Sequence, residues 1–202
     1  MSSITQATDA TYEATLMQTA EFIVVDVETT HGDPMRGSII ELAVIAHNGI
    51  RELDRWNTLV NTSAELSPFI QKLTGITPGM LEGAPFFPTV AKSLHASTHG
   101  RIMVAHNVRY DMTALQHELA RTGLSYQPDT LCTERLCRQL VPNLSYYNLG
   151  SLSRYFGIRQ GHKHRAAHDA QAALELLLRL INDHGQERVM KAVVPWVQEA
   201  RA

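Results

Sequence analysis

An apolar segment that ends in two alternating acids most constrains the fold of this chain. Residues 21–30 read EFIVVDVETT, so Phe22–Val25 lead directly to Asp26 and Glu28. Successive aromatic and β-branched residues predict a buried strand. Residues two apart on a strand point to the same face, so the two carboxylates lie close together and repel each other. We expect either a hydrated acidic strand end or a hard divalent cation such as magnesium or manganese, which oxygen ligands suit.

Size and composition indicate an ordinary globular protein. The chain has 202 residues, of which 44% are hydrophobic and 19% charged, which favours one domain with a substantial core. The formal net charge of -2 provides no overall basic surface for long nucleic acids. Cys132 and Cys137 are too few and wrongly spaced for a disulfide scaffold or a zinc ribbon, so we expect reduced thiols.

No segment indicates a membrane or a secretion route. No apolar run approaches the length that crosses a bilayer. Residues 1–20 lack the basic leader and the apolar stretch of a signal peptide. We therefore expect a cytoplasmic protein without membrane association.

Hydrophobic periodicity predicts a mixed α/β fold. Residues 37–60 are typical of two antiparallel strands joined by a two-residue turn at Asn48-Gly49, which completes a three-strand meander. Strands and helices alternate afterwards, which favours a mixed sheet with helices on both faces. The later segments are strands within 101–106 and at the start of 129–142, and helices within 67–75, 88–98, 107–123, 129–142, 148–158, 168–183 and 187–202, the last one broken near Pro195.

Two further aspartates lie where the first acidic pair would need them. Asp111 follows a short apolar strand and is expected in the first turn of a helix. Asp169 opens the most apolar helix and lies five residues after His164. A helix dipole also favours acids at such positions, so each aspartate alone is explained without a ligand.

Three segments together resemble the DEDDh exonucleases. VVDVETT at 24–30, HNVRYD at 106–111 and HRAAHDA at 164–170 are similar to the three motifs of that family, in the same order. The interval from His164 to Asp169 is that of the DEDDh branch. Three ordered motifs are a specific pattern, whereas any one of them alone is weak.

The resemblance extends beyond the motifs and has two departures. Residues 21–183 are similar to the proofreading epsilon subunit of bacterial DNA polymerase III and its relatives. Tyr110 replaces the usual phenylalanine of the second motif, and Ala167 and His168 replace the usual residues of the third. The resemblance implies a ribonuclease H-like, five-stranded mixed sheet. We expect a single exonuclease domain over 1–202, with a short N-terminal extension and a C-terminal helical tail around this core.

The activity that the resemblance implies is 3′-to-5′ exonuclease hydrolysis of single-stranded or frayed ends, with DNA favoured. The resemblance also implies that two divalent cations, Mg²⁺ or Mn²⁺, serve the reaction. Asp26, Glu28 and Asp169 are expected to hold the first ion, Asp26 also reaches the second, and Asp111 contributes through ligated water. His164 is expected to act as the general base for the attacking water.

Substrate contacts are also implied by the resemblance. The few basic residues are not concentrated anywhere, so we expect affinity to depend on metal, stacking and the 3′ terminus. The expected contacts to the terminal nucleotide come from backbone groups and side chains of Thr29, Thr30, Leu73, Thr74, His106, Asn107 and Tyr110.

Three alternatives stay open at this point. A zinc site could form from His162, His164 and His168, because the last two lie four residues apart. The same fold could serve an exoribonuclease, or a non-catalytic partner of replication or repair proteins. The short tail after Asp183 favours a free-standing enzyme over a polymerase subunit. Oligomeric state is not indicated by the sequence.

Overall fold

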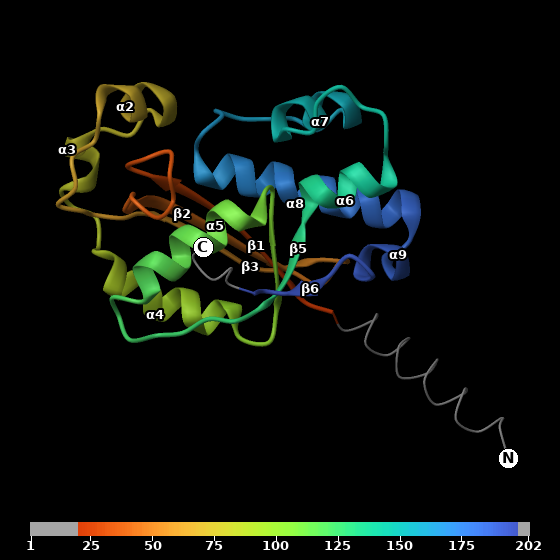
Figure 1. Cartoon of the computed structure of the whole chain (residues 1–202), viewed down its shortest axis with the longest axis horizontal. Coiled ribbons are helices and arrows are strands. Elements are labelled where there is room, and N and C mark those ends of the chain that lie inside the picture. The colour runs from red at the N-terminus through yellow and green to blue at the C-terminus, as the bar shows by residue number, and fades with distance from the viewer. Residues whose placement is uncertain (1–19, 198–202) are drawn as a thin grey trace, which may run out of the picture.

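Across residues 20–197, one mixed sheet of six strands organises the structure (Figure 1). The computed structural model describes residues 20–197, so most of the predicted N-terminal extension and the last five residues lie outside the described part. The strand order is β3-β2-β1-β4-β5-β6, which places β1 inside the sheet. The strands are β1 (Phe22–Thr29), β2 (Ile39–His47), β3 (Glu52–Leu59), β4 (Ile102–Ala105), β5 (Asp129–Cys132) and β6 (Val194–Pro195).

The sheet joins an antiparallel meander to parallel strands. β1 pairs antiparallel with β2, and β2 pairs antiparallel with β3. On its other side β1 pairs parallel with β4, which in turn pairs parallel with β5. The carboxyl ends of these three parallel strands therefore meet at one edge of the sheet, where open α/β sheets place their ligands. The predicted mixed fold is confirmed.

Helices cover both faces of the sheet (Figure 1). Phe22 and Val24 pack into a core with α6, α7 and α8, whereas Ile23 and Val25 pack into a second core with α4 and α5. This alternation is what a strand buried on both faces requires. The helices are α2 (Pro68–Thr74), α3 (Pro78–Leu81), α4 (Phe87–Thr98), α5 (Val108–Leu119), α6 (Thr133–Leu140), α7 (Leu149–Phe156), α8 (Ala166–His184) and α9 (Gln186–Met190).

Helix boundaries follow local signals in the sequence. The Ser67 hydroxyl accepts a hydrogen bond from the Ile70 N–H, Pro68 begins α2, and Gly75 ends it with a φ of 72°. Asn148 caps α7 in the same way through the Ser151 N–H. Among the helices of residues 20–197, none is long and apolar enough to cross a membrane.

Two local predictions were wrong. The β2–β3 connection spans residues 48–51 rather than two residues, because the Asn48 side chain accepts hydrogen bonds from the N–H groups of Ile50 and Arg51. The tail does not continue as a helix to Pro195. After α9 it forms β6, which pairs with β5 and gives the sheet its sixth strand. Pro195 lacks an N–H group and lies in the edge strand, where proline is tolerated.

β3 lies at the opposite edge of the sheet and is polar. Glu52, Asp54 and Arg55 are exposed, whereas its partner β2 is buried along its whole length. Arg55 pairs with Glu52 at 2.6 Å and also donates to Gln171 on α8 at 2.5 Å. In the meander, β2 is therefore completely buried, and the charged strand β3 lies between it and solvent at the sheet edge.

We expect the packing of α8 on the sheet to dominate stability. Leu177 is fully buried on α8, and its neighbour Leu178 is only partly buried. Leu177→Ala should lower the free energy of unfolding by about 2–5 kcal/mol, since it removes buried methyl groups and leaves a cavity. Leu178→Ala is the matched control and should lower it less. Urea denaturation of both variants measures the difference, and equal losses would contradict this packing.

Candidate active site

The first acidic pair lies at the carboxyl end of β1. Phe22 and Val24 face α8, so the alternation of the strand directs Asp26 and Glu28 to that face as well. Asp26 and Glu28 are both partly buried. The predicted pair of like charges on one face is therefore present at the edge where the parallel strands end.

Asp111 reaches this edge from α5. It lies in the first turn of the helix and is 3% exposed. Its Oδ1 accepts a hydrogen bond from the Val27 N–H at 3.1 Å, which ties the helix start to the strand between the two acids. Asn107 precedes α5 in the left-handed region at a φ of 66°, a conformation that asparagine tolerates. The chain can therefore turn sharply from β4 into α5.

His164 and Asp169 approach from the start of α8. Asp169 lies in the first turn of this helix, and its Oδ2 accepts a hydrogen bond from the His164 N–H at 2.9 Å. His164 itself is exposed and has a φ of 57°. Its backbone conformation is uncommon for a residue with a Cβ atom. The Asp169 carboxylate thus holds the histidine segment as well as facing the site.

These residues converge although they are distant in the sequence. One ligand atom each from Glu28, His164 and Asp169 lies within 4.8 Å of the others. The charges of Asp111, Glu28 and Asp169 all act on the Asp26 carboxyl, so these four acids are close to one another. The structure therefore brings together all five residues predicted to be catalytic.

Burial and crowding raise the proton affinity of the acids. Burial, together with the charges of Asp169, Glu41 and Asp111, raises the pKa of Glu28 to about 8. Burial also raises the pKa of Asp111 to about 8, although the hydrogen bond from the Val27 N–H lowers this pKa. Burial and then the charge of Asp111 raise the pKa of Asp26 well above its usual range. Burial and like charges disfavour the ionised form of these acids, and positive charge nearby would stabilise it.

The donor set fits divalent cations. Carboxylate oxygens from rigid elements are the ligands that hard cations prefer, and the crowding of like charges gives the binding its driving force. Over residues 20–197, the one group of three or more suitable side chains is Glu28, His164 and Asp169. His162 and His168 do not join it, which speaks against the three-histidine zinc site. The His168 Nδ1 instead lies 3.2 Å from the His162 carbonyl oxygen.

Two residues beside the cluster were missed by the sequence analysis. Glu41 on β2 is 1% exposed and forms an ion pair with Arg165 at 2.9 Å. Arg165 directly follows His164 in the chain. One signal was available, because Glu41 interrupts the apolar run IIELAVIA at 39–46. A charge in such a run indicates a buried partner or a site.

Thr29, Thr30 and Tyr110 lie beside the acids. The Tyr110 hydroxyl contacts the Thr29 Oγ1 at 2.5 Å and donates to the His31 carbonyl at 3.1 Å. The extra hydroxyl of Tyr110, relative to phenylalanine, therefore ties α5 to the segment after β1. The Thr30 N–H already donates to the Ser38 carbonyl at 2.9 Å. A nucleotide would have to compete for that donor.

The other predicted substrate contacts differ in their surroundings. Leu73 is 38% exposed at the end of α2, whereas the Thr74 hydroxyl is buried and donates to Ile70. The His106 ring nitrogens lie 3.0 Å from the Thr133 hydroxyl and 2.9 Å from a backbone carbonyl oxygen, so both are already engaged by protein. Asn107 is exposed next to it.

Fold and site together define a nuclease class, and a family comparison agrees. The model of the exonuclease family matches residues 23–177, a range that includes the four carboxylates of the cluster and His164. The chain belongs to this exonuclease family. The predicted resemblance is thereby confirmed at the level of the family, whose members depend on divalent metal ions.

Curated relatives are much longer than this chain. A PolC-type DNA polymerase III of Caldanaerobacter subterraneus is 32% identical over 161 residues, which cover 80% of this chain and 12% of the relative. The 3′-5′ exonuclease DinG of Bacillus subtilis is 30% identical over 188 residues, which cover 92% of this chain and 20% of the relative. The chain thus spans an eighth to a fifth of these relatives.

Solved structures share the fold at low identity. A structure described as exonuclease X in complex with 5′ overhanging duplex DNA has a TM-score of 0.69 at 23% identity, over 85% of this chain and 98% of that chain. The nuclease domain of 3′hExo, described as a DEDDh family member bound to rAMP, has a TM-score of 0.72 at 20% identity, over 83% and 94% of the two chains. These likenesses support the ribonuclease H-like fold.

The metal-free protein should lose stability as the pH rises from about 5 to about 8. Carboxyl groups of an unfolded chain have pKa values of about 4, whereas the pKa values of Glu28 and Asp111 are raised to about 8 in the folded protein. In this range the folded chain binds more protons, so deprotonation disfavours folding. Added Mn²⁺ should reverse the loss, since it binds the ionised acids of the folded state.

Thermal melting across this pH range, with and without MnCl₂, measures the effect. Asp111→Asn serves as the comparison and should show a weaker pH dependence, because one of the shifted groups is gone. A melting temperature of the metal-free protein that increases with pH over this range would contradict the charge crowding.

Proposed function

We propose that this chain is a 3′-to-5′ exonuclease that removes nucleoside monophosphates from single-stranded or frayed 3′ ends. The observation that supports it most is the convergence of Asp26, Glu28, Asp111, His164 and Asp169 at the carboxyl end of β1. These residues lie in the three segments that resemble the DEDDh motifs, all within the range that matches the exonuclease family. We further propose that residues 1–202 form a single exonuclease domain.

The four carboxylates are proposed to hold two Mg²⁺ or Mn²⁺ ions. Asp26, Glu28 and Asp169 are the candidates for the first ion, Asp26 also for the second, and Asp111 acts through water. Bound divalent cations supply an activated water and neutralise the charge that develops on the leaving oxygen. The four ionised acids provide as much negative charge as two such ions carry positive.

His164 is proposed to accept the proton of the attacking water at an imidazole nitrogen. Its exposed ring projects from the segment that the Asp169 carboxylate holds, so the base and the cluster share one support. Exposure lets the ring return the proton to solvent after each turnover. On the buried side of the site, the Val27 N–H of β1 donates to the Asp111 carboxylate.

The 3′-terminal nucleotide is proposed to lie against the segment after β1, the start of α5 and the end of α2. Thr29, Thr30, Asn107 and Tyr110 line the first two of these, and the exposed part of Leu73 offers an apolar surface for a base. Thr74 and His106 support the same region through their hydrogen bonds to protein. Stacking and terminal contacts suit short single strands.

DNA is the favoured substrate, and an exoribonuclease is the second candidate. Solved neighbours of this fold are described in complex with DNA and with rAMP, so the fold accommodates either sugar. The PolC-type relatives point to a replication context for the matching region. A non-catalytic partner role is disfavoured because all five residues are present and gathered.

Replacing the catalytic residues should slow nucleotide release strongly. Asp169→Ala removes a proposed metal ligand, and His164→Ala should lower the rate by about 10²–10⁴-fold if it is the general base. Paired 5′- and 3′-labelled DNA and RNA oligomers of equal sequence, in Mg²⁺ or Mn²⁺, report activity, polarity and sugar preference. Asp183→Asn, at the exposed far end of α8, is the matched control and should leave the rate unchanged.

The result that would overturn the proposal is a folded wild-type protein that degrades neither oligomer with either metal. Shortening from the 5′ end, or equal rates for Asp169→Ala and wild type, would do the same. Faster release from RNA than from DNA would instead favour the exoribonuclease.

A further inference from the structure

Glu41 is a fifth carboxylate at the active site. It pairs directly with Glu28 in the register of β1 and β2, and residues opposite each other in such a pair share a face. Glu41 therefore lies beside a proposed metal ligand on the side that faces α8. It is 1% exposed, and a buried carboxylate is costly unless it is paired and hydrogen-bonded.

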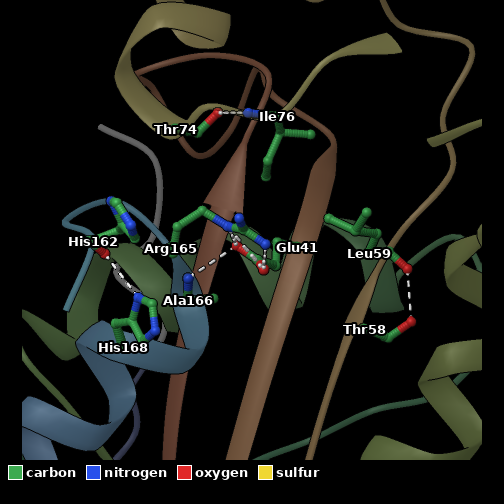
Figure 2. A network of polar contacts seen from close by, with 9 residues as sticks. All are labelled: Glu41, Thr58, Leu59, Thr74, Ile76, His162, Arg165, Ala166 and His168. Atoms are coloured by element: carbon green, nitrogen blue, oxygen red, sulfur yellow. Dashed lines mark hydrogen bonds and ion pairs between the residues drawn. The ribbon is translucent and has the colours of Figure 1, made fainter. Parts of the chain in front are cut away.

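Arg165 provides that pairing in a two-pronged geometry. Its Nε lies 3.2 and 3.1 Å from the two Glu41 oxygens, and its Nη2 donates to Oε1 at 2.9 Å. The Ala166 N–H, the first of α8, donates to Oε2 at 3.0 Å (Figure 2). One buried carboxylate thus fixes both the side chain and the backbone at the start of this helix.

The fixed segment directly follows His164. The left-handed backbone of His164 is uncommon for a residue with a Cβ atom, so neighbouring contacts must maintain it. The Asp169 carboxylate accepts the His164 N–H, and the Asp169 N–H in turn donates to the Arg165 carbonyl at 3.1 Å. A continuous set of hydrogen bonds therefore runs from Glu41 through Arg165 to Asp169 and His164.

The other end of the histidine segment is held by packing. A Cβ atom on Gly161 would lie 2.7 Å from the His168 ring, so the ring occupies the space that a side chain would need. The same ring faces the His162 carbonyl oxygen (Figure 2). Residues 161–165 are thus fastened at their start by His168 and at their end by Glu41.

Arg165 also sets the charge of the site. Glu41 brings the number of neighbouring carboxylates to five, and one guanidinium offsets one of them. The remaining four match the charge of two divalent ions. The Arg165 charge lowers the pKa of Glu28, whereas the charges of Asp169, Glu41 and Asp111 raise it, so loss of Arg165 would leave the effect of Glu41 less opposed.

We propose that Glu41 and Arg165 form a positioning pair of the active site, which holds His164 and Asp169 against Glu28 and removes the charge of the fifth carboxylate. This proposal rests on the exonuclease function proposed above. Neither residue is proposed to touch substrate or metal. The pair acts through the residues that do.

Three variants separate the anchoring from the charge. Arg165→Lys keeps the charge but loses the two-pronged contact, Glu41→Gln loses the negative charge and one of the two accepting oxygens, and the double variant Glu41→Gln/Arg165→Gln removes both charges and the anchor. Arg179→Lys is the matched control, because Arg179 forms an exposed ion pair with Asp183 on the same helix. Arg165 is partly exposed, so Arg165→Lys tests the proposal even if loss of the buried charge prevents folding.

The first measurement is kcat at saturating metal and oligonucleotide. We expect all three variants to lose at least about tenfold in kcat, with KM changed by less than about threefold, because the pair positions the base and a ligand rather than the substrate. The double variant should lose little more than the worse single variant, since both changes break one contact.

The second measurement is Mn²⁺ binding without substrate, by calorimetry. Glu41→Gln leaves an extra positive charge and should weaken binding by at least about fivefold. Arg165→Lys keeps the charge and should weaken binding less than Glu41→Gln does, and the double variant should also bind better than Glu41→Gln. The third measurement is amide exchange of His164 in the metal-free protein, which should be faster in all three variants and unchanged in Arg179→Lys.

The outcomes distinguish the two proposals. If the wild type releases no nucleotides, the proposed exonuclease function is wrong. Mn²⁺ binding and His164 amide exchange would then still test whether Glu41 and Arg165 act as a positioning pair. If the wild type is active, folded variants with wild-type kcat would overturn the pair. Unchanged His164 exchange in Arg165→Lys, or equal Mn²⁺ affinities for Glu41→Gln and wild type, would overturn it as well.

Discussion

Crowding of negative charge at the end of β1 is the constraint on which the rest of the structure depends. Asp26 and Glu28 share one strand face, and Asp111 and Asp169 reach it from two helices that begin there. A cluster of this kind opposes folding, so the surrounding scaffold must hold it. Two opposite hydrophobic cores on β1 do so, because each face of the strand is packed against its own group of helices.

Two left-handed residues direct the chain into the site. Asn107 precedes α5, and His164 lies two residues before α8. Each lets the chain enter a helix whose first turn carries an aspartate facing β1. Asparagine adopts this conformation readily, whereas histidine in it needs support. The contacts of Asp169, Arg165 and Glu41 provide support at the second entry.

The sequence allowed the motif residues and the order of the elements to be predicted, because both depend on local patterns. The alternation in β1, the Ser67 and Asn148 caps and the stripe of α8 are all encoded within a few residues. The sixth strand and the Glu41–Arg165 pair were not predictable in this way. β6 pairs with β5, which precedes it by more than 60 residues, and the Glu41–Arg165 pair joins residues 124 positions apart.

The charged outer strand has a consequence for the solution behaviour of the protein. β3 is an edge of the sheet, and unpaired backbone groups of an edge strand can template β-sheet extension by another chain. The exposed side chains of Glu52, Asp54 and Arg55 would have to be desolvated before such an extension could form. These charged side chains therefore disfavour intermolecular β-sheet formation at the β3 edge, and the neighbouring strand β2 stays buried.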